Sequence, residues 1–528
     1  HKDLEDHLEW IKFSGMSWAG DGFYYSRFPK PDDGGELDDA NENSMVYYHK
    51  LGTNQQQDRL IFSDPENPRI SNYISTTDDE KYLILYRTKG THGTALYISH
   101  VNMGEHEFYP VIDNYEYDHS IVGNISNIFY LHTNYNAPNW RLVKFKYNNS
   151  EPKNWIDVIP ESEYPLNSVS IVDGKMLVKY SKDVTSRLYV YSLEGKMETE
   201  VTLPTMGTAY GFSGKMDETE VFYTFTSFAY PTTVFRYDIR RNTSILFRQP
   251  KIDINFSKYE TKQIFYLSPD GTRIPMFITH KKGLSYNGTA PTLLYAYGGF
   301  NISINPHFSI SRMILIESGG IYATANIRGG GEYGEKWHKG GMLTNKQNVF
   351  DDFIAAADYL VSENYTSRDK LAIQGGSNGG LLIGAVINQR QDICAVALPA
   401  VGVMDMLRYT KFTIGWAWAT EYGDPEKSEE LFQYIYSYSP LHNIQGNNNY
   451  PAVMVTTADH DDRVVPAHSF KYTATIQAMN QKNSKPLLIR VETNAGHGAG
   501  MPTSKRIQKS ADIWSFMFHN LNAKYMAP

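Results

Sequence analysis

The sequence predicts two domains of different fold class, an all-β propeller over residues 1–251 and an α/β domain over residues 252–528. Three observations lead to this division. A strand-like run recurs at a nearly constant spacing in the first half. Buried-looking strands alternate with helical segments in the second half, which predicts a doubly wound, mostly parallel sheet. The motif Gly375-Gly376-Ser377-Asn378-Gly379 stands where one of those strands is expected to turn into a helix.

The first half contains a repeat of about five units. Short apolar runs separated by Gly, Asn and Asp are typical of strands joined by turns. One run recurs at intervals of 50, 46, 46 and 46 residues, at residues 46–48, 96–98, 142–144, 188–190 and 234–236. A second run precedes most of these, at residues 82–84, 128–130, 176–178 and 221–223. A period of about 40–50 residues with several strands per unit favours propeller blades over a β-sandwich.

From about Lys251 the pattern changes to strands and helices in turn. Apolar residues at helical spacing from Phe350 to Val361 predict a helix. Six apolar runs predict the strands of one buried sheet: residues 292–297, 321–327, 371–374, 394–398, 452–455 and 487–491. Functional sites in open α/β sheets form beyond the carboxyl ends of the strands. The residues that follow these runs are therefore the first candidates for chemistry.

Composition narrows the function classes. Hydrophobic residues make up 41% of the 528 residues and charged residues 20%, which is ordinary for a chain with a large core. The net charge of −8 argues against a broad basic face for nucleic acid. Apolar runs stay well short of the ~18–20 residues that a membrane helix needs, so we expect no membrane partner. A single cysteine, Cys394, excludes an intrachain disulfide and predicts a cytoplasmic location.

Ser377 is the candidate nucleophile. It lies in a Gly-x-Ser-x-Gly motif after the expected strand 371–374 and before an apolar helical segment. A sharp turn between a strand and a helix presents such a serine above the edge of the sheet. Small neighbours are needed because the turn is strained and tightly packed. This context predicts the nucleophile elbow of an α/β hydrolase rather than a glycine-rich turn with a solvated serine.

A serine nucleophile needs a base, and the base needs a carboxylate that orients it. In this fold the acid and the histidine follow the serine along the chain. Asp459, Asp461 and Asp462 come after the expected strand 452–455, and His497 comes after the expected strand 487–491. The order is as required, but the residues by themselves do not choose among the three aspartates.

Other ionisable residues compete for a functional role. His460 lies in the acidic run, yet no second histidine stands at ligand spacing, so we expect a structural role and no metal site. Glu332, Glu335 and His338 belong to or follow the glycine-rich segment 328–334. That segment lacks the Lys-Ser/Thr pair of a phosphate-binding loop, and we interpret it as a packed structural loop.

At these motifs the chain resembles the prolyl oligopeptidase family of serine peptidases. The resemblance covers essentially the whole length and is densest from Ile264 onward. Its ordered motifs lie at residues 297–300, 328–334, 375–380, 402–407, 411–415, 459–466 and 496–500. The resemblance implies a seven-bladed propeller that covers an α/β-hydrolase catalytic domain.

The resemblance also implies a role for each motif residue. Ser377 would be the nucleophile, His497 the base and Asp461 the orienting acid. Tyr297 would donate its hydroxyl to the oxyanion, together with the backbone N–H of Asn378. The second donor follows from the fold as well, because the residue after the nucleophile supplies an oxyanion N–H.

A proline pocket is implied by a further set of matches. Proline is a flat apolar ring without an N–H, so its pocket needs aromatic faces and few polar groups. By resemblance, Trp418 and Tyr422 stack on the ring and close the pocket, and Arg463 holds a substrate carbonyl. The apolar walls would be Phe300, Val403 and Val464. Trp416 departs from the family pattern, which usually has a small or polar residue there.

We therefore expect a cofactor-free serine endopeptidase that cleaves short proline-containing peptides after proline, acting as a monomer. Relatives with other specificity, such as oligopeptidase B or an acylaminoacyl peptidase, are alternatives. Oligopeptidase B would need an acidic pocket for basic residues, and the apolar residues Trp418 and Tyr422 disfavour such a pocket. A peptide macrocyclase or transpeptidase shares the acyl-enzyme and stays open. A propeller-based interaction protein with an inactive hydrolase domain is the alternative from another class.

The number of repeats leads to one more expectation. About five units are visible where the family has seven blades, and the family's N-terminal segment is not matched. We expect a longer native chain, and we expect a fragment with exposed propeller edges to be unstable or poorly active.

Overall fold

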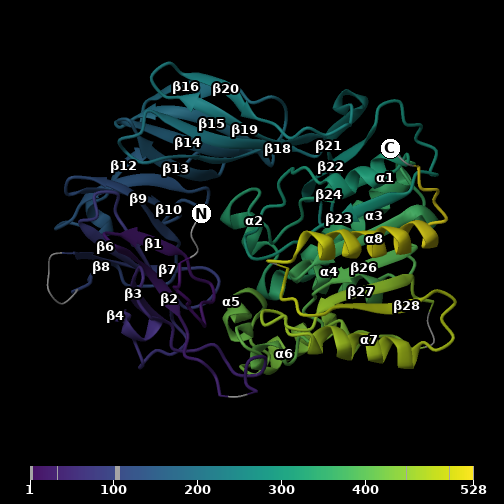
Figure 1. Cartoon of the computed structure of the whole chain (residues 1–528). Coiled ribbons are helices and arrows are strands. Elements are labelled where there is room, and N and C mark those ends of the chain that lie inside the picture. The colour runs from purple at the N-terminus through teal and green to yellow at the C-terminus, as the bar shows by residue number, and fades with distance from the viewer. Residues whose placement is uncertain (1–3, 33, 102–106, 447–448, 499, 527–528) are drawn as a thin grey trace.

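The computed structural model describes residues 4–32, 34–101, 107–446, 449–498 and 500–526. Sheets connected by turns, with two short 3-10 helices and no described α-helix, occupy the chain as far as Arg248, and a sheet with helices on both faces begins at Tyr259. Figure 1 shows the two parts side by side, the first in purple to teal and the second in green to yellow. The predicted fold class, a propeller joined to an α/β-hydrolase domain, is confirmed.

The first part consists of five four-stranded antiparallel sheets, each built from consecutive strands. The first two sheets contain β1 Met16–Ala19, β2 Gly22–Arg27, β3 Met45–Lys50 and β4 Arg59–Phe62, then β5 Ser71–Thr76, β6 Tyr82–Thr88, β7 Thr94–His100 and β8 Tyr109–Ile112. The third contains β9 His119–Ile125, β10 Ile128–Thr133, β11 Arg141–Lys146 and β12 Ile156–Ile159. The last two contain β13 Leu166–Val172, β14 Lys175–Lys182, β15 Thr185–Ser192 and β16 Met197–Val201, then β17 Thr208–Ser213, β18 Glu220–Ser227, β19 Tyr230–Asp238 and β20 Thr243–Arg248.

The repeat in the sequence corresponds to fixed strand positions. The recurring run lies in the third strand of every sheet, β3, β7, β11, β15 and β19, and the preceding run lies in the second strand of four of them. These two strands are central in their sheets, and in the inner sheets both of their faces pack against neighbouring sheets. Phe129 and Leu131 of β10, for example, pack with Ile84 of β6 and Leu96 of β7. The spacing was visible because central strands need the same apolar run in each unit.

The second part is built on one eight-stranded sheet in the order β21-β22-β24-β23-β25-β26-β27-β28. β22 is antiparallel to β21 and β24, and the other pairs are parallel. The strands are β21 Tyr259–Leu267, β22 Arg273–Lys281, β23 Thr292–Tyr295, β24 Ile321–Ala325, β25 Leu371–Gly376, β26 Val396–Ala400, β27 Ala452–Ala458 and β28 Leu487–Glu492. β23 and β24 end two residues before the expected ends, because the chain there leaves the sheet and continues as loops.

Helices cover both faces of this sheet, and alternate strand residues point into the two layers. Leu294 and Ile373 pack against α3 and α4, whereas Leu293 and Ala372 pack with residues of α1 and α8. The helices are α1 Met313–Glu317, α2 Glu335–Lys339, α3 Gln347–Ser362, α4 Asn378–Gln389, α5 Ala419–Tyr422, α6 Glu429–Tyr438, α7 Ala467–Met479 and α8 Thr503–Asn520. Within the described ranges, none of the helices combines the length and apolar character that crossing a bilayer requires.

The two domains touch at both ends of their interface. On one side, Tyr333 donates to Asp183 Oδ1 at 3.0 Å, and Thr208 Oγ1 donates to the Pro306 carbonyl at 2.7 Å. On the other side, the indole of Trp416 donates to the Asn41 carbonyl at 3.2 Å. The residue that departs from the family pattern therefore contacts the propeller. These contacts place the propeller against the carboxyl edge of the parallel strands (Figure 1).

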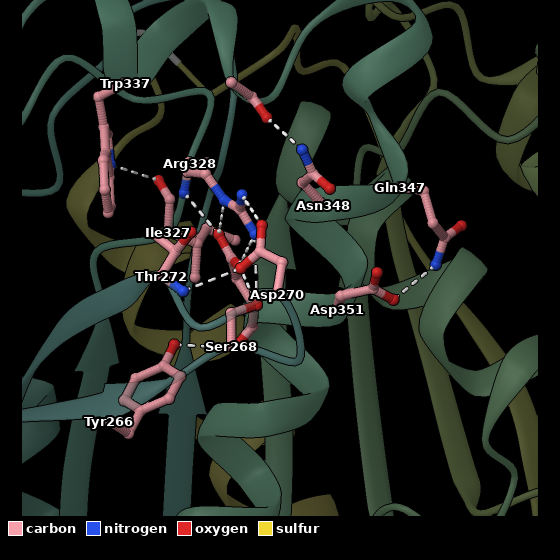
Figure 2. Close-up of polar contacts among 12 residues, drawn as sticks. Tyr266, Ser268, Asp270, Thr272, Ile327, Arg328, Trp337, Gln347, Asn348 and Asp351 are labelled. Atoms are coloured by element: carbon pink, nitrogen blue, oxygen red, sulfur yellow. Dashed lines mark hydrogen bonds and ion pairs between the residues drawn. The ribbon is translucent and has the colours of Figure 1, made fainter.

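A buried ion pair fixes the glycine-rich loop that follows β24. Arg328 Nη2 and Nε lie 2.6 and 3.0 Å from the two carboxylate oxygens of Asp352 in α3, and the backbone N–H of Arg328 donates to the same carboxylate. Ser268 and Asp270, from the β21–β22 turn, complete the cluster (Figure 2). Asp352 is fully buried, and burial raises the pKa of its carboxyl while Arg328 opposes that rise.

We predict that Asp352→Asn lowers the free energy of unfolding by about 3–5 kcal/mol, because it leaves the buried guanidinium of Arg328 without its principal counter-charge. Urea denaturation monitored by tryptophan fluorescence measures the effect. Asp351→Asn is the matched control, since Asp351 is the neighbouring residue and, among the described side-chain contacts, its carboxylate bonds only the Gln347 amide, at 2.9 Å (Figure 2). Equal destabilisation in both variants would contradict the assignment.

Candidate active site

Ser377 lies at a strained turn between β25 and α4. Its φ is 57° and its ψ is −119°, a conformation that residues with a side chain rarely adopt. Backbone packing holds the turn, since a Cβ on Gly375 would lie 2.3 Å from the Gly379 carbonyl oxygen. A Cβ on Gly380 would likewise lie 2.6 Å from the Ala400 carbonyl oxygen. The flanking glycines are therefore required by close approach of main chains, as the sequence motif predicts.

Among the three candidate aspartates, the structure joins Asp461 to His497. Asp461 Oδ2 lies 2.6 Å from His497 Nδ1, and its Oδ1 accepts the backbone N–H groups of Arg463 and Val464 at 3.1 and 2.9 Å. The carboxylate is fully buried and held by three hydrogen bonds. Asp459 instead binds the neighbouring His460, at 2.6 Å.

The third aspartate, Asp462, forms an ion pair with the propeller residue Lys12 at 2.9 Å. His460, for which we expected a structural role, is exposed, and within the described residues its ring bonds only Asp459. His497 itself lies in a loop with left-handed residues at Asn494 and Gly498, and Ala499 of the same motif lies outside the described residues. Among the described hydrogen bonds, none joins His497 to Ser377, so the structure joins the expected base to the expected acid but not to the expected nucleophile.

Tyr297 lies beside the serine on the loop that follows β23. Burial and the charge of Glu421 raise the pKa of its hydroxyl to about 12, although a hydrogen bond with Ser377 acts in the opposite direction. The phenol is therefore protonated at neutral pH and can donate a hydrogen bond. Asn378 is the first residue of α4, and the first N–H groups of a helix have no acceptor within the helix. Both expected oxyanion donors thus lie next to Ser377.

A cavity of about 280 Å³ opens next to Ser377 at the interface of the two domains. Five of the six predicted pocket residues line it: Phe300, Val403, Trp418, Tyr422 and Arg463. The sixth, Val464, is buried behind the cavity and contacts Asp461 through its N–H. The propeller contributes Phe13, Ser71, Tyr73, Gly90 and Thr91 to the same lining, which the sequence did not indicate.

Aromatic rings define the shape of this cavity. Trp418 ends the short 3-10 helix Gly415–Trp418, and its ring is nearly parallel to that of Tyr409, at 6.2 Å and 12°. Phe300 and Tyr422 meet edge to face at 5.4 Å and 90°. The guanidinium of Arg463 lies 5.2 Å from the Phe13 ring of the propeller, at the rim. The arrangement provides flat apolar surfaces with one cation at the edge.

The buried carboxylate of Glu421 binds the backbone of one pocket residue. Glu421 is fully buried; its Oε1 accepts the backbone N–H of Phe300 at 2.8 Å and its Oε2 lies 2.8 Å from His338 Nε2. Burial lowers the pKa of His338, but Glu335 and Glu421 outweigh it and raise it to about 9. The loop we interpreted as structural is packed, and His338, which follows it, binds the carboxylate that accepts the N–H of Phe300, whose φ is 59°.

Two buried charged residues beside the site, Glu421 and Lys346, were not anticipated from the sequence. Lys346 Nζ donates to the Gly298 carbonyl at 2.8 Å and to Asn378 Oδ1 at 3.0 Å. The sequence carries one weak signal, because Lys346 stands at the N-cap of α3, the end of a helix where a cation is unfavourable. Glu421 carries none, since a glutamate in a short helix is ordinary.

Comparison with known proteins agrees with this geometry. The model of the prolyl oligopeptidase N-terminal β-propeller domain matches residues 1–250, and that of the prolyl oligopeptidase family matches residues 306–524. A prolyl endopeptidase of Elizabethkingia miricola is 47% identical over 526 residues, covering 99% of this chain and 74% of its own length. A dual function macrocyclase-peptidase of Galerina marginata is 38% identical, covering 97% of this chain and 72% of its own length.

A solved structure from work on two prolyl endopeptidases superposes with a TM-score of 0.93 at 38% identity, covering 98% of this chain and 76% of that chain. The agreement extends over both domains and their arrangement. This chain belongs to the prolyl oligopeptidase family of serine peptidases.

Proposed function

We propose that this chain is a prolyl oligopeptidase, a serine endopeptidase that hydrolyses short peptides on the C-terminal side of proline. The main support for the proposal is that Ser377 lines a small cavity whose walls include Phe300, Trp418 and Tyr422. A proline residue has no backbone N–H, so binding its ring against this apolar wall leaves no hydrogen-bond donor of the ring unpaired. Relatives that are themselves prolyl endopeptidases support the same conclusion.

The reaction begins when the Ser377 hydroxyl attacks the carbonyl carbon of the proline residue. His497 accepts the hydroxyl proton at Nε2, because its Nδ1–H is held by Asp461 at 2.6 Å. The loop around His497 has to bring Nε2 within hydrogen-bond distance of Ser377 when substrate is bound. His497 then gives the proton to the leaving amine, and water hydrolyses the acyl-enzyme.

Two donors stabilise the negative charge that develops on the carbonyl oxygen. These are the hydroxyl of Tyr297, which is protonated because its pKa is raised to about 12, and the N–H of Asn378 at the start of α4. Loss of one such donor typically costs about 3–4 kcal/mol of barrier stabilisation. Arg463, at the rim, is placed to bind a substrate backbone carbonyl.

The position of the cavity supports short peptides as substrates. Propeller residues such as Phe13, Tyr73 and Thr91 form one of its walls, so a substrate has to fit between two domains. We propose short proline-containing peptides as the partners of a monomeric enzyme that needs no cofactor, nucleic acid or membrane. The single cysteine, Cys394, is buried and unpaired, which supports a cytoplasmic location.

Transfer of the acyl group to an amine is a second candidate outcome of the same intermediate. The observation that favours it is the 38% identity to a dual function macrocyclase-peptidase. Water and a peptide amine would compete for the acyl group on Ser377, and the products distinguish them. Mass spectrometry of a longer peptide with an internal proline would show either two linear fragments or a cyclic product.

The first prediction concerns the nucleophile and the pocket together. Wild-type protein should cleave a short Pro peptide at least about 100-fold more efficiently than the matched Ala peptide, since the ring fills the aromatic cavity. Ser377→Ala should reduce turnover by about a million-fold. Initial rates on both peptides, with active sites counted by a fluorophosphonate probe, measure these effects. If a folded wild-type protein that includes the N-terminal segment of the family cleaves neither peptide, an interaction protein is favoured.

The second prediction tests the choice of acid. Asp461→Asn should lower kcat by about 10,000-fold, because the amide no longer holds His497 in the tautomer that can accept a proton at Nε2. Steady-state kinetics measure the loss. Asp462→Asn is the matched control, since that adjacent carboxylate binds Lys12 and not the histidine, and it should keep kcat within about threefold. A reversed ranking of the two variants would overturn the assignment.

The third prediction concerns specificity. Trp418→Ala should lower kcat/KM for the Pro peptide by about 10- to 100-fold and for the Ala peptide by much less, because only the larger ring uses the indole surface. Trp416→Phe is the control, since Trp416 contacts the propeller and not the cavity. If Trp418→Ala lowered kcat/KM for both peptides equally, the indole would have no role in the selection of proline.

A further inference from the structure

Lys346 is a buried lysine whose ammonium bonds neutral acceptors. It is 1% exposed, and its two hydrogen-bond partners are the Gly298 carbonyl at 2.8 Å and Asn378 Oδ1 at 3.0 Å. In the part of the chain that the structure describes, no carboxylate lies within ion-pair distance of its nitrogen. Burying a cation in this way is unfavourable unless its remaining contacts compensate. Well-packed apolar residues often replace buried ionic groups without loss of stability, so packing alone does not explain a lysine here.

The two acceptors belong to the two segments that carry the oxyanion donors. Gly298 directly follows Tyr297, and Asn378 supplies the N–H at the start of α4. The Asn378 side chain also donates to the Tyr297 carbonyl at 2.6 Å and accepts from the Tyr422 hydroxyl at 3.0 Å. The Lys346 nitrogen lies 5.4 Å from the centre of the Tyr422 ring. One ammonium thus connects the loop after β23, the start of α4 and the pocket.

We propose that Lys346 is a positioning residue, whose ammonium sets the separation between the Tyr297 hydroxyl and the Asn378 N–H. The inference rests on the proposed function and deepens it. Oxyanion donors stabilise the transition state only when both reach the same oxygen at about 2.7–3.1 Å. A shift of about 1 Å in such a group can lower the rate about 100-fold. Tying both donor segments to one rigid point prevents that shift.

The charge of Lys346 gives the proposal a second signature. Burial lowers the pKa of the Lys346 ammonium to about 8, although Glu421 acts in the opposite direction. A lowered pKa means that the charged form is present below about pH 8 and is lost as the pH rises through that value. The neutral amine retains two weaker N–H donors, so turnover should decline to a lower plateau and not to zero.

The charged and titratable groups around Lys346 are Tyr422, Tyr434 and Glu421, the last bonded to His338, and Tyr297 precedes the Gly298 whose carbonyl accepts from the ammonium. The pKa values of the three tyrosines are raised, so these groups are neutral around pH 8. His338, with a pKa of about 9, is the other group that loses a proton on the alkaline side. A variant of Lys346 separates the two, because an alkaline decline that belongs to His338 would survive in it.

The test uses Lys346→Met, which keeps the length of the side chain and removes its donors and charge. Lys346→Gln keeps two N–H donors without the charge. Lys370→Met is the matched control, because Lys370 also donates to two carbonyl oxygens, those of Leu521 and Asn522, at 2.7 and 3.1 Å. For each protein, kcat and KM for the Pro peptide are measured from pH 6 to 10. Inhibition by a Pro-aldehyde peptide, which forms a tetrahedral adduct with the serine, is compared with inhibition by the product peptide.

We expect Lys346→Met to lower kcat about 10- to 100-fold with KM within about threefold, since the lost interaction acts in the transition state. Affinity for the aldehyde should fall in parallel while affinity for the product peptide is retained. The decline above pH 8 should disappear in both Lys346 variants. Lys346→Gln should recover part of kcat, and Lys370→Met should match wild type.

Unchanged kcat and an unchanged pH profile in both Lys346 variants would overturn the inference, as would an equal loss in Lys370→Met. If Lys346→Met does not fold, measurements on Lys346→Gln and on wild-type protein test the proposal instead. Wild-type affinity for the aldehyde should then weaken above pH 8 while product affinity stays constant, and a constant ratio of the two would reject the proposal. Ser377→Ala distinguishes failure of the Lys346 proposal from failure of the proposed function. If Ser377→Ala is inactive, a negative result for the Lys346 variants concerns Lys346 alone. If Ser377→Ala is active, the proposed function fails as well.

Discussion

The site depends on one constraint, the close packing of main chains around the strained turn at Ser377. With φ at 57°, the serine adopts a conformation that is unfavourable in isolation and is held by its surroundings. Gly375 and Gly380 allow the Gly379 and Ala400 backbones to approach within distances that a Cβ would exclude. The hydroxyl therefore lies at the carboxyl edge of the sheet, and the loops after β23, β27 and β28 carry Tyr297, Asp461 and His497 at the same edge.

Buried charges surround that turn, and each is compensated in a different way. Asp461 receives two backbone N–H groups besides His497, Glu421 receives the Phe300 N–H and His338, and Lys346 bonds two neutral oxygens. Removing such groups from water is unfavourable, so they persist only where several contacts replace the lost hydration. Away from the site, the Arg328–Asp352 pair plays the equivalent part for the glycine-rich loop. Rigid polar networks of this kind hold donors in place before substrate arrives.

The substrate cavity belongs to neither domain alone. Phe300, Trp418 and Tyr422 provide the apolar faces from the hydrolase domain, whereas Phe13 and Tyr73 close the cavity from the propeller. Lys12 of the propeller also forms an ion pair with Asp462, the residue after the expected acid Asp461, so the interface extends to the loop that carries Asp461. A displacement of one whole domain relative to the other would therefore change the shape of the cavity.

The sequence by itself determined the two fold classes, the candidate nucleophile and the order of its expected partners. Central propeller strands need the same apolar run in each unit, and the turn at Ser377 needs glycine, so both leave local patterns. The choice of Asp461 by hydrogen bonding, the propeller wall of the cavity and the burial of Lys346 and Glu421 were decided only by the tertiary structure. These features depend on which segments, far apart in the chain, come into contact. The sequence around a single charged residue does not distinguish a residue that becomes buried from one that stays exposed.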